Sequence, residues 1–180
     1  MSELVSSSWF WAMMQCLVVA VTAVLLLAQV RAQTSSHIVV ASEAILVRWN
    51  SPSTLRLRRT VATQGLAGDS SFNASAQALA EIIENLAMYM RHRAVPDAVL
   101  WSLLSWSVEH YYQLFKNGIE QERHAFKDPT LFSGIIKLDR RFKSISGRSG
   151  ASIFDRTDDE MRKFLTYEAN YCDAVLSAGQ

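Results

Sequence analysis

The N-terminal stretch of this chain is the feature that most limits what the chain can fold into. No charged side chain occurs between Leu4 and Val30, and the run from Trp9 to Val30 is almost wholly apolar. As an α-helix rising about 1.5 Å per residue, that run would reach about 33 Å, close to the thickness of a bilayer's hydrocarbon core. The sequence therefore predicts a short segment over residues 1–8 and a single transmembrane helix over residues 9–31.

A cleaved signal peptide is the alternative interpretation of the same stretch. Val30-Arg31-Ala32 places small or modest residues at the positions that a signal peptidase inspects. Against this, no basic residue precedes the apolar run, which is longer than the about 7 to 15 residues typical of a signal peptide. We favour an uncleaved anchor, and a mature chain beginning at Gln33 would contradict it.

The positions of the arginines predict an orientation. Glu3 is the one charged side chain before the run, whereas Arg31 and Arg48 follow it. Because basic residues favour the cytoplasmic side, the N-terminus is predicted outside and the rest of the chain in the cytoplasm, at the inner (cytoplasmic) membrane. A cluster of three further arginines either contacts anionic membrane lipid or forms a solvated helix face; its members are Arg56, Arg58 and Arg59.

Composition limits the class of partner. The net charge of +1 and the 19% of charged residues are not typical of a nucleic-acid-binding protein, so no nucleic-acid partner is predicted. The two cysteines encode no disulfide framework, since Cys16 lies in the predicted span and Cys172 far from it. Cys172 falls on an apolar stripe and is interpreted as a small core residue.

The rest of the chain is predicted to be all-α, a small helical bundle domain after the membrane helix. We expect a juxtamembrane helical connector over 32–72, a helical domain over 73–143, a flexible linker over 144–154 and a C-terminal amphipathic helix over 155–178. Within the connector, residues 38–49 are interpreted as a helical run, either a helix of its own or an extension of the anchor helix, and residues 54–63 as a second short helix.

Local signals place the helix ends. Asn73 caps an amphipathic helix over 74–93, and Pro96 opens an apolar helix that continues to Phe126 with a weak point at Asn117-Gly118. Asp128-Pro129 predicts a further helix start, because a capping residue is followed by proline at the first helical position. Thr157, with Glu160 three residues on, forms a capping box for the last helix.

The segment 73–142 resembles an uncharacterised family of small bacterial proteins that have an N-terminal membrane anchor and a helical domain of unknown function. The resemblance implies architecture and anchoring, with no catalytic residues to transfer, and some of the relatives look like phage-resistance proteins. It is carried by Glu84-Asn85-Leu86-Ala87, Val95-Pro96-Asp97, the run Trp101 to Trp106, Ile119-Glu120-Gln121-Glu122-Arg123, Asp128-Pro129-Thr130-Leu131-Phe132, Leu138 and Phe142.

Patterns that would indicate chemistry are missing from the sequence. The Glu-x-x-His pairs of helical metal sites, the Gly-x-Ser-x-Gly of many hydrolases and glycine-rich phosphate loops do not occur. Glu120 and His124 share a helix face, where such a pair ordinarily only supports the helix. We predict no catalytic, metal or cofactor residues, and no enzyme.

Polar residues near the apolar faces are interpreted as a structural clamp that fixes helix register. Asn85 lies at the edge of its helix's apolar face and is expected to hydrogen-bond between helices. Arg123 is expected to pair with Glu120 or with Glu84 on a neighbouring helix.

Four aromatic residues of the long helix are candidates for a docking surface, with core packing as the alternative: Trp101, Trp106, Tyr111 and Tyr112. If both tryptophans are more than half buried, the docking interpretation loses its support. The function we expect is a non-enzymatic interaction or regulatory module at the membrane, with a protein partner or homo-oligomer. The alternatives are a membrane-perturbing effector, as in phage resistance, and a helical enzyme with an unfamiliar site.

Overall fold

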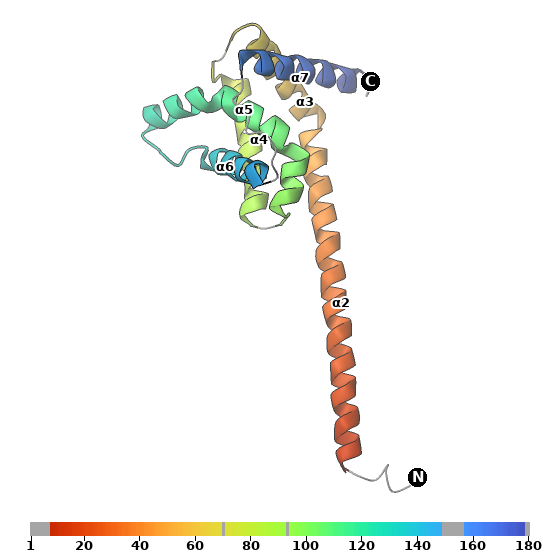
Figure 1. The fold of residues 1–180 in the computed structure, drawn as a ribbon. Coiled ribbons are helices and arrows are strands. Elements are labelled where there is room, and N and C mark those ends of the chain that lie inside the picture. Colours follow the sequence, from red (N-terminus) through yellow and green to blue (C-terminus); the bar gives the residue numbers. More distant parts are fainter. Residues whose placement is uncertain (1–7, 70, 93, 149–156, 179–180) are drawn as a thin grey trace. The chain divides into compact units, whose positions relative to one another are not determined.

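The structure, a computed structural model, describes residues 8–69, 71–92, 94–148 and 157–178. In these ranges all regular secondary structure is helical, which confirms the all-α prediction. The six helices are α2 (Ser8–Trp49), α3 (Pro52–Leu66), α4 (Ala74–Arg91), α5 (Asp97–Phe126), α6 (Ser133–Arg148) and α7 (Asp158–Ala178), labelled in Figure 1.

Helix α2 runs without a break for 42 residues, so residues 38–49 do extend the N-terminal helix. The apolar side chains of its N-terminal part are largely exposed, Val19 to 68% and Leu25 to 64%. By length and composition this helix is long and apolar enough to cross a membrane. Thr22 adds little polarity, because its hydroxyl donates to the carbonyl of Val18 at 2.8 Å within the same helix.

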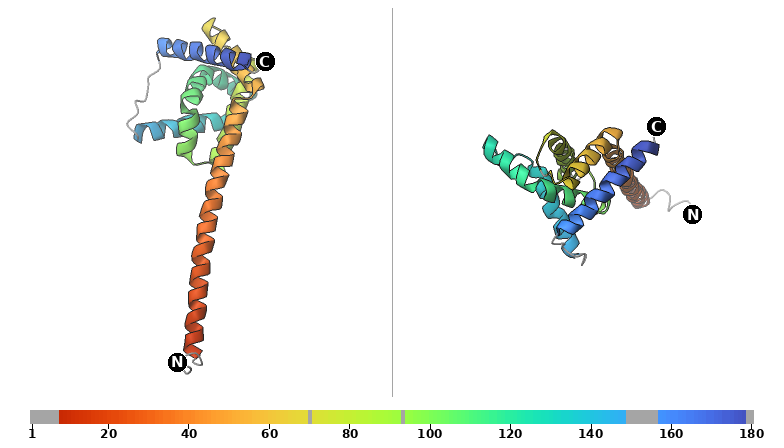
Figure 2. Two further views of the ribbon diagram at one scale, coloured as in Figure 1. Left: turned by 90° about the vertical axis from the view of Figure 1, so that its right-hand side faces the viewer. Right: turned by 90° about the horizontal axis from the view of Figure 1, so that it is seen from above.

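The chain divides into two compact units, residues 1–40 and 41–180. Within the second unit one hydrophobic core draws on every helix, and α7 lies beside α3 (Figures 1 and 2). Residues of the predicted segments 32–72, 73–143 and 155–178 all contribute to this core. Each helix contributes at least one fully or nearly fully buried side chain to this core. In the order α2 to α7, examples are Ile45, Val61, Ile83, Val108, Phe142 and Phe164.

The junction before α4 and the middle of α5 follow from local chemistry. Asn73 caps α4, since its Oδ1 accepts from the backbone N–H groups of Ser75 and Ala76 at 3.1 and 3.2 Å. Helix α5 passes through Gly118 without interruption, and a Cβ at that position would collide with the side chain of Phe72. Gly118 therefore allows Phe72 to pack closely against α5, and it does not interrupt the helix.

The prediction that a helix begins at Asp128-Pro129 is wrong, because α6 begins at Ser133. Phe132 adopts a left-handed backbone with φ of +53°, which an α-helix cannot pass through. The Asp128 carboxylate instead accepts from the backbone of Thr130 at 2.8 Å and closes a turn.

Helix α6 continues to Arg148, so residues 144–148 of the predicted linker are helical and 149–154 lie outside the described residues. The start of α7 agrees with its predicted cap, since the backbone N–H of Glu160 donates to the Thr157 hydroxyl at 3.4 Å.

Candidate functional site

The most concentrated polar chemistry in the described residues is a buried ion pair between α3 and α7. The Arg58 guanidinium donates from Nε and Nη2 to the two carboxylate oxygens of Glu168, at 2.9 and 3.0 Å. The Tyr111 hydroxyl of α5 donates to the same carboxylate at 3.0 Å. The three residues are only 3%, 1% and 0% exposed, so a charged pair and a phenol close one network joining three helices.

The end of α2 completes this network. Arg58 Nη1 donates to the backbone carbonyl of Trp49 at 3.4 Å, and the guanidinium carbon lies 4.6 Å from the centre of the Trp49 ring. Tyr171 of α7 offers a second ring at 5.6 Å. Aromatic faces stabilise a desolvated cation, so Arg58 is held by charge, hydrogen bonds and rings together.

Burial and charge act on the ionisation of this network. Burial disfavours the charged guanidinium, yet the charge and hydrogen bond of Glu168, together with the nearby Tyr111 and Cys172, outweigh burial and the pKa of Arg58 is raised. Burial, followed by the Glu168 charge, raises the pKa of Tyr111 well above its ordinary value. At neutral pH the site is therefore a closed, internally neutralised ion pair with a protonated phenol.

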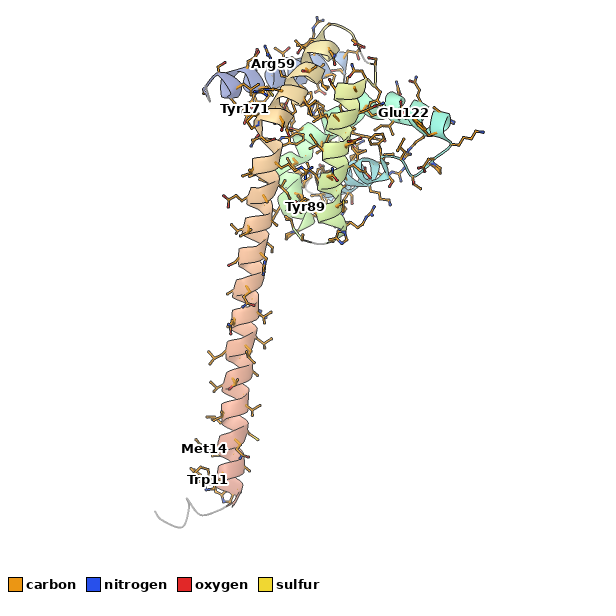
Figure 3. The ribbon with its side chains drawn as sticks, turned by 180° about the vertical axis from the view of Figure 1, so that it is seen from behind. Trp11, Met14, Arg59, Tyr89, Glu122 and Tyr171 are labelled. Carbon is orange, nitrogen blue, oxygen red and sulfur yellow. The ribbon has the colours of Figure 1, made fainter. Side chains whose placement is uncertain are left out.

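The predicted lipid contact of Arg58 is wrong, because its guanidinium is committed to Glu168 in the core. Arg56 is exposed. Arg59 is 53% exposed and pairs with Asp173 of α7 at 2.5 Å; Figure 3 shows Arg59 and Tyr171 where α3 and α7 meet. A lipid contact of Arg56 and Arg59 stays a prediction.

The four residues of the predicted clamp do not come together. Glu84 accepts from the backbone N–H groups of Gly134 and Ile135 at 2.8 and 2.7 Å, which caps the start of α6. A Cβ on Gly134 would lie 2.7 Å from that carboxylate, so the glycine leaves room for the cap. The carboxylate also suits the positive end of the helix dipole.

Arg123 holds the loop before α6 by a second contact, since its Nε donates to the Leu131 carbonyl at 2.7 Å. Glu120 and Asn85 are exposed, so the interhelical hydrogen bond expected of Asn85 is not what the structure shows. Polar residues here fix a loop rather than the register of two helices.

The docking interpretation of the aromatic residues loses its support. Tyr111 is fully buried, and both tryptophans are more than half buried: Trp101 is partly buried, with its indole N–H donating to the Ser146 hydroxyl at 3.0 Å, and Trp106 is 47% exposed. Tyr112 is partly buried, and burial followed by the charge of Asp139 raises its pKa. Core packing explains most of this aromatic run.

Other candidate chemistry is dispersed. In the described ranges no three or more His, Cys, Asp or Glu side chains gather where they could hold a metal ion. His92 and His124 are exposed, while His110 is buried with its ring stacked 4.3 Å from that of Phe164. Cys172 is fully buried, and burial raises the pKa of its thiol to about 11, which keeps the thiol protonated at neutral pH.

Comparison of the chain with known protein families, curated proteins and solved structures finds no match. The resemblance of residues 73–142 to an anchored helical family stays a prediction, and function has to be argued from the geometry.

The Arg58–Glu168 pair was missed at the level of sequence, although a signal was present. Glu168 lies four residues after Phe164 and four before Cys172, on the apolar stripe of its helix. Arg58 lies between Leu55 and Val61 on a similar stripe. Opposite charges at the centres of two apolar stripes indicate a buried pair, because a buried charge requires a partner.

Proposed function

We propose that this protein is a single-pass membrane protein, in which residues 9–30 of α2 lie in the bilayer and the 41–180 unit acts as a non-enzymatic interaction or regulatory module. The observation that carries the proposal is the exposure of the apolar side chains of α2. Val18, Val19, Val24 and Leu25 are each more than half exposed. Exposed apolar area costs about 25 cal/mol per Å² in water, so a continuous run of such residues favours a lipid environment.

Backbone chemistry supports the same proposal. A bilayer core accepts helices because each helical N–H and C=O is satisfied within the segment, and α2 is unbroken throughout the apolar run. The segment's hydroxyl at Thr22 is satisfied in the same way. The backbone of the apolar run and its one threonine hydroxyl are therefore satisfied within the helix, and Gln15 and Gln29 are the amide side chains that the span carries.

The arginines support a cytoplasmic module at the inner membrane. With Arg58 neutralised inside the core, the positive-inside bias rests on Arg31, Arg48, Arg56 and Arg59. The pairing of Arg58 with Glu168 inside the core, away from open surface, suits a module that binds through its surface better than one that performs chemistry.

The test of anchoring compares two double substitutions in the full chain. Val21→Arg with Leu25→Arg puts two charges in the proposed span, at about 2.5–3.5 kcal/mol each, and should release the protein from membranes washed with alkaline carbonate. Ser36→Arg with Val39→Arg alters exposed positions beyond the span and should leave the protein in the pellet. Equal behaviour of the two variants, or a mature chain that begins at Gln33, contradicts the proposal.

Orientation is tested in a Cys16→Ser background. Ser2→Cys should react with a membrane-impermeant maleimide on intact cells, whereas Ala178→Cys should react only after lysis. Labelling of Ala178→Cys on intact cells would place the module outside the cytoplasm. Cross-linking in cells that recovers the chain only as a monomer would contradict the interaction role.

A further inference from the structure

One side of α2 carries exposed apolar residues that are not buried in the core and that lie outside the segment proposed to cross the bilayer. In the 41–180 unit, Ile45 and Trp49 face the core at 0% and 4% exposure, while Val47 is 65% exposed. In the 1–40 unit, Val40 is 64% exposed although it lies beyond residue 31. Apolar side chains left open in a water-facing stretch of helix mark a contact surface.

The spacing of these residues is that of a coiled coil. Val40, Ala44 and Val47 follow each other at intervals of four and three, which is the a and d spacing of a heptad repeat. The same intervals continue toward the N-terminus, through small and branched residues apart from Gln33 and His37. In order along α2, the positions are Ala12, Cys16, Val19, Ala23, Leu26, Val30, Gln33, His37, Val40, Ala44 and Val47.

Charges flank this seam in the pattern of a parallel pair. With Ala44 at position a, Glu43 falls at g and Arg48 at the next e, five residues on. In a parallel two-stranded coil a g residue meets the following e residue of the other chain, so Glu43 would meet Arg48 twice, once on each side. An antiparallel pair would not bring these two positions together, and both side chains are exposed.

We infer that α2 pairs with α2 of a second copy of this chain in a parallel homodimer, through the seam that ends at Val40, Ala44 and Val47. Because Ile45 and Trp49 face the core, the second copy approaches from the opposite side of the last turns of α2. Gln33 and His37 lie in the seam, where polar residues fix register at some cost in stability. The parallel direction rests on the proposed function, since two chains anchored alike enter the bilayer the same way.

Cysteine cross-linking in native membranes tests the seam with matched positions. In a Cys16→Ser background, Val40→Cys and Val47→Cys should form a covalent dimer on oxidation with copper phenanthroline, because disulfides need Cα atoms within about 7 Å. Val39→Cys is the control, since Val39 is exposed to 63%, like Val40, but lies off the seam. Cross-linking that is equal at residues 39 and 40, or missing at 40 and 47, overturns the inference.

A charge swap tests the direction of the pair. Glu43→Arg and Arg48→Glu should each weaken dimerisation of the full chain in mild detergent by roughly tenfold, because each places like charges together at two symmetric sites. The double variant should restore the affinity of the original chain. Single variants that weaken the dimer without recovery in the double variant contradict the parallel register.

The experiments distinguish a chain that does not dimerise from a chain that is not anchored in the membrane. Membrane-bound protein that does not cross-link overturns the dimer alone, whereas protein missing from the membrane fraction overturns the proposed function.

Discussion

Two neighbouring arginines of α3 make the same kind of contact with α7 in opposite surroundings. Arg58 pairs with Glu168 where both side chains are almost fully buried, at 3% and 1% exposure. Arg59 pairs with Asp173 where the side chains are 53% and 50% exposed. The helices and the chemistry are the same, so solvent is the main difference between the two pairs.

The comparison shows that an ion pair's distance does not set its importance. In water, a pair gains little over its solvated charges, commonly between about 0 and 1 kcal/mol. In the core, each charge has lost its hydration, so removal of one partner leaves the other without compensation. The inner pair should therefore be indispensable to the fold and the outer pair nearly dispensable.

The largest expected effect is that of Glu168→Gln, which keeps the size of the side chain and removes its charge. Arg58 cannot lose its proton, so its cation would remain unpaired in the core at a cost of about 3–5 kcal/mol in the free energy of unfolding. Urea unfolding of the full chain in mild detergent, followed by tryptophan fluorescence, measures it. A loss below about 1 kcal/mol would show that water reaches the pair.

Tyr111→Phe should have an intermediate effect. It removes one hydrogen bond to a buried carboxylate and leaves the ring in place, for an expected loss of about 1.5–3 kcal/mol in the same assay. Tyr112→Phe is the matched control on the adjacent residue, which is partly buried, and should change stability less. Equal losses would mean that the Tyr111 hydroxyl is not special.

Raising the pH to about 10 should lower the free energy of unfolding by about 1 kcal/mol, because the buried thiol of Cys172 holds its proton more tightly in the fold than in the unfolded chain. Its thiol pKa is about 11 in the fold against an ordinary value of 9.0, so the unfolded chain loses the proton first. The stabilisation is complete below pH 9 and is lost as the pH rises toward 11. Tyr111 acts in the same direction above pH 10, its ordinary pKa.

Melting curves of the original chain and of Cys172→Ala between pH 8 and pH 11 measure this slope. The variant starts from a lower stability, because a buried side chain has been shortened, but its decline between pH 9 and pH 10 should be flatter. Parallel declines would show that the thiol does not titrate with unfolding.

The smallest expected effect is that of Asp173→Asn, the outer counterpart of Glu168→Gln. We expect a change below about 0.5 kcal/mol that shrinks further in high salt, because exposed charges are screened. A loss comparable to that of Glu168→Gln would remove the distinction between the two pairs.

Much of the fold could be predicted because local signals decide it. The apolar run gave α2, the capping residues Asn73 and Thr157 gave the starts of α4 and α7, and helical periodicity gave their core faces. Asp128-Pro129 misled because Phe132 takes a left-handed backbone and Glu84, far away in sequence, caps α6 in its place. A capping residue that is far away in the sequence leaves no signal in the residues next to the helix that it caps.

The site was harder to predict because it depends on which faces meet. Counting Arg56, Arg58 and Arg59 as one basic cluster treated them as neighbours, although a helix turns successive residues to different sides. The three side chains accordingly lie in different surroundings. Arg56 is exposed, Arg58 is buried with Glu168, and Arg59 pairs with Asp173 at the surface. Tyr111 was likewise grouped with exposed aromatics although its hydroxyl serves a carboxylate on another helix.

The buried pair also sets an order of events during synthesis. Arg58 and Glu168 are separated by 110 positions in the chain. At about 5–20 residues per second, the arginine is synthesised roughly 5–20 s before its counter-ion. Through that interval the Arg58 cation has no carboxylate of its own to pair with, because the chain has not yet been synthesised as far as Glu168. The network that joins α3, α5 and α7 can therefore close only after synthesis has passed Glu168.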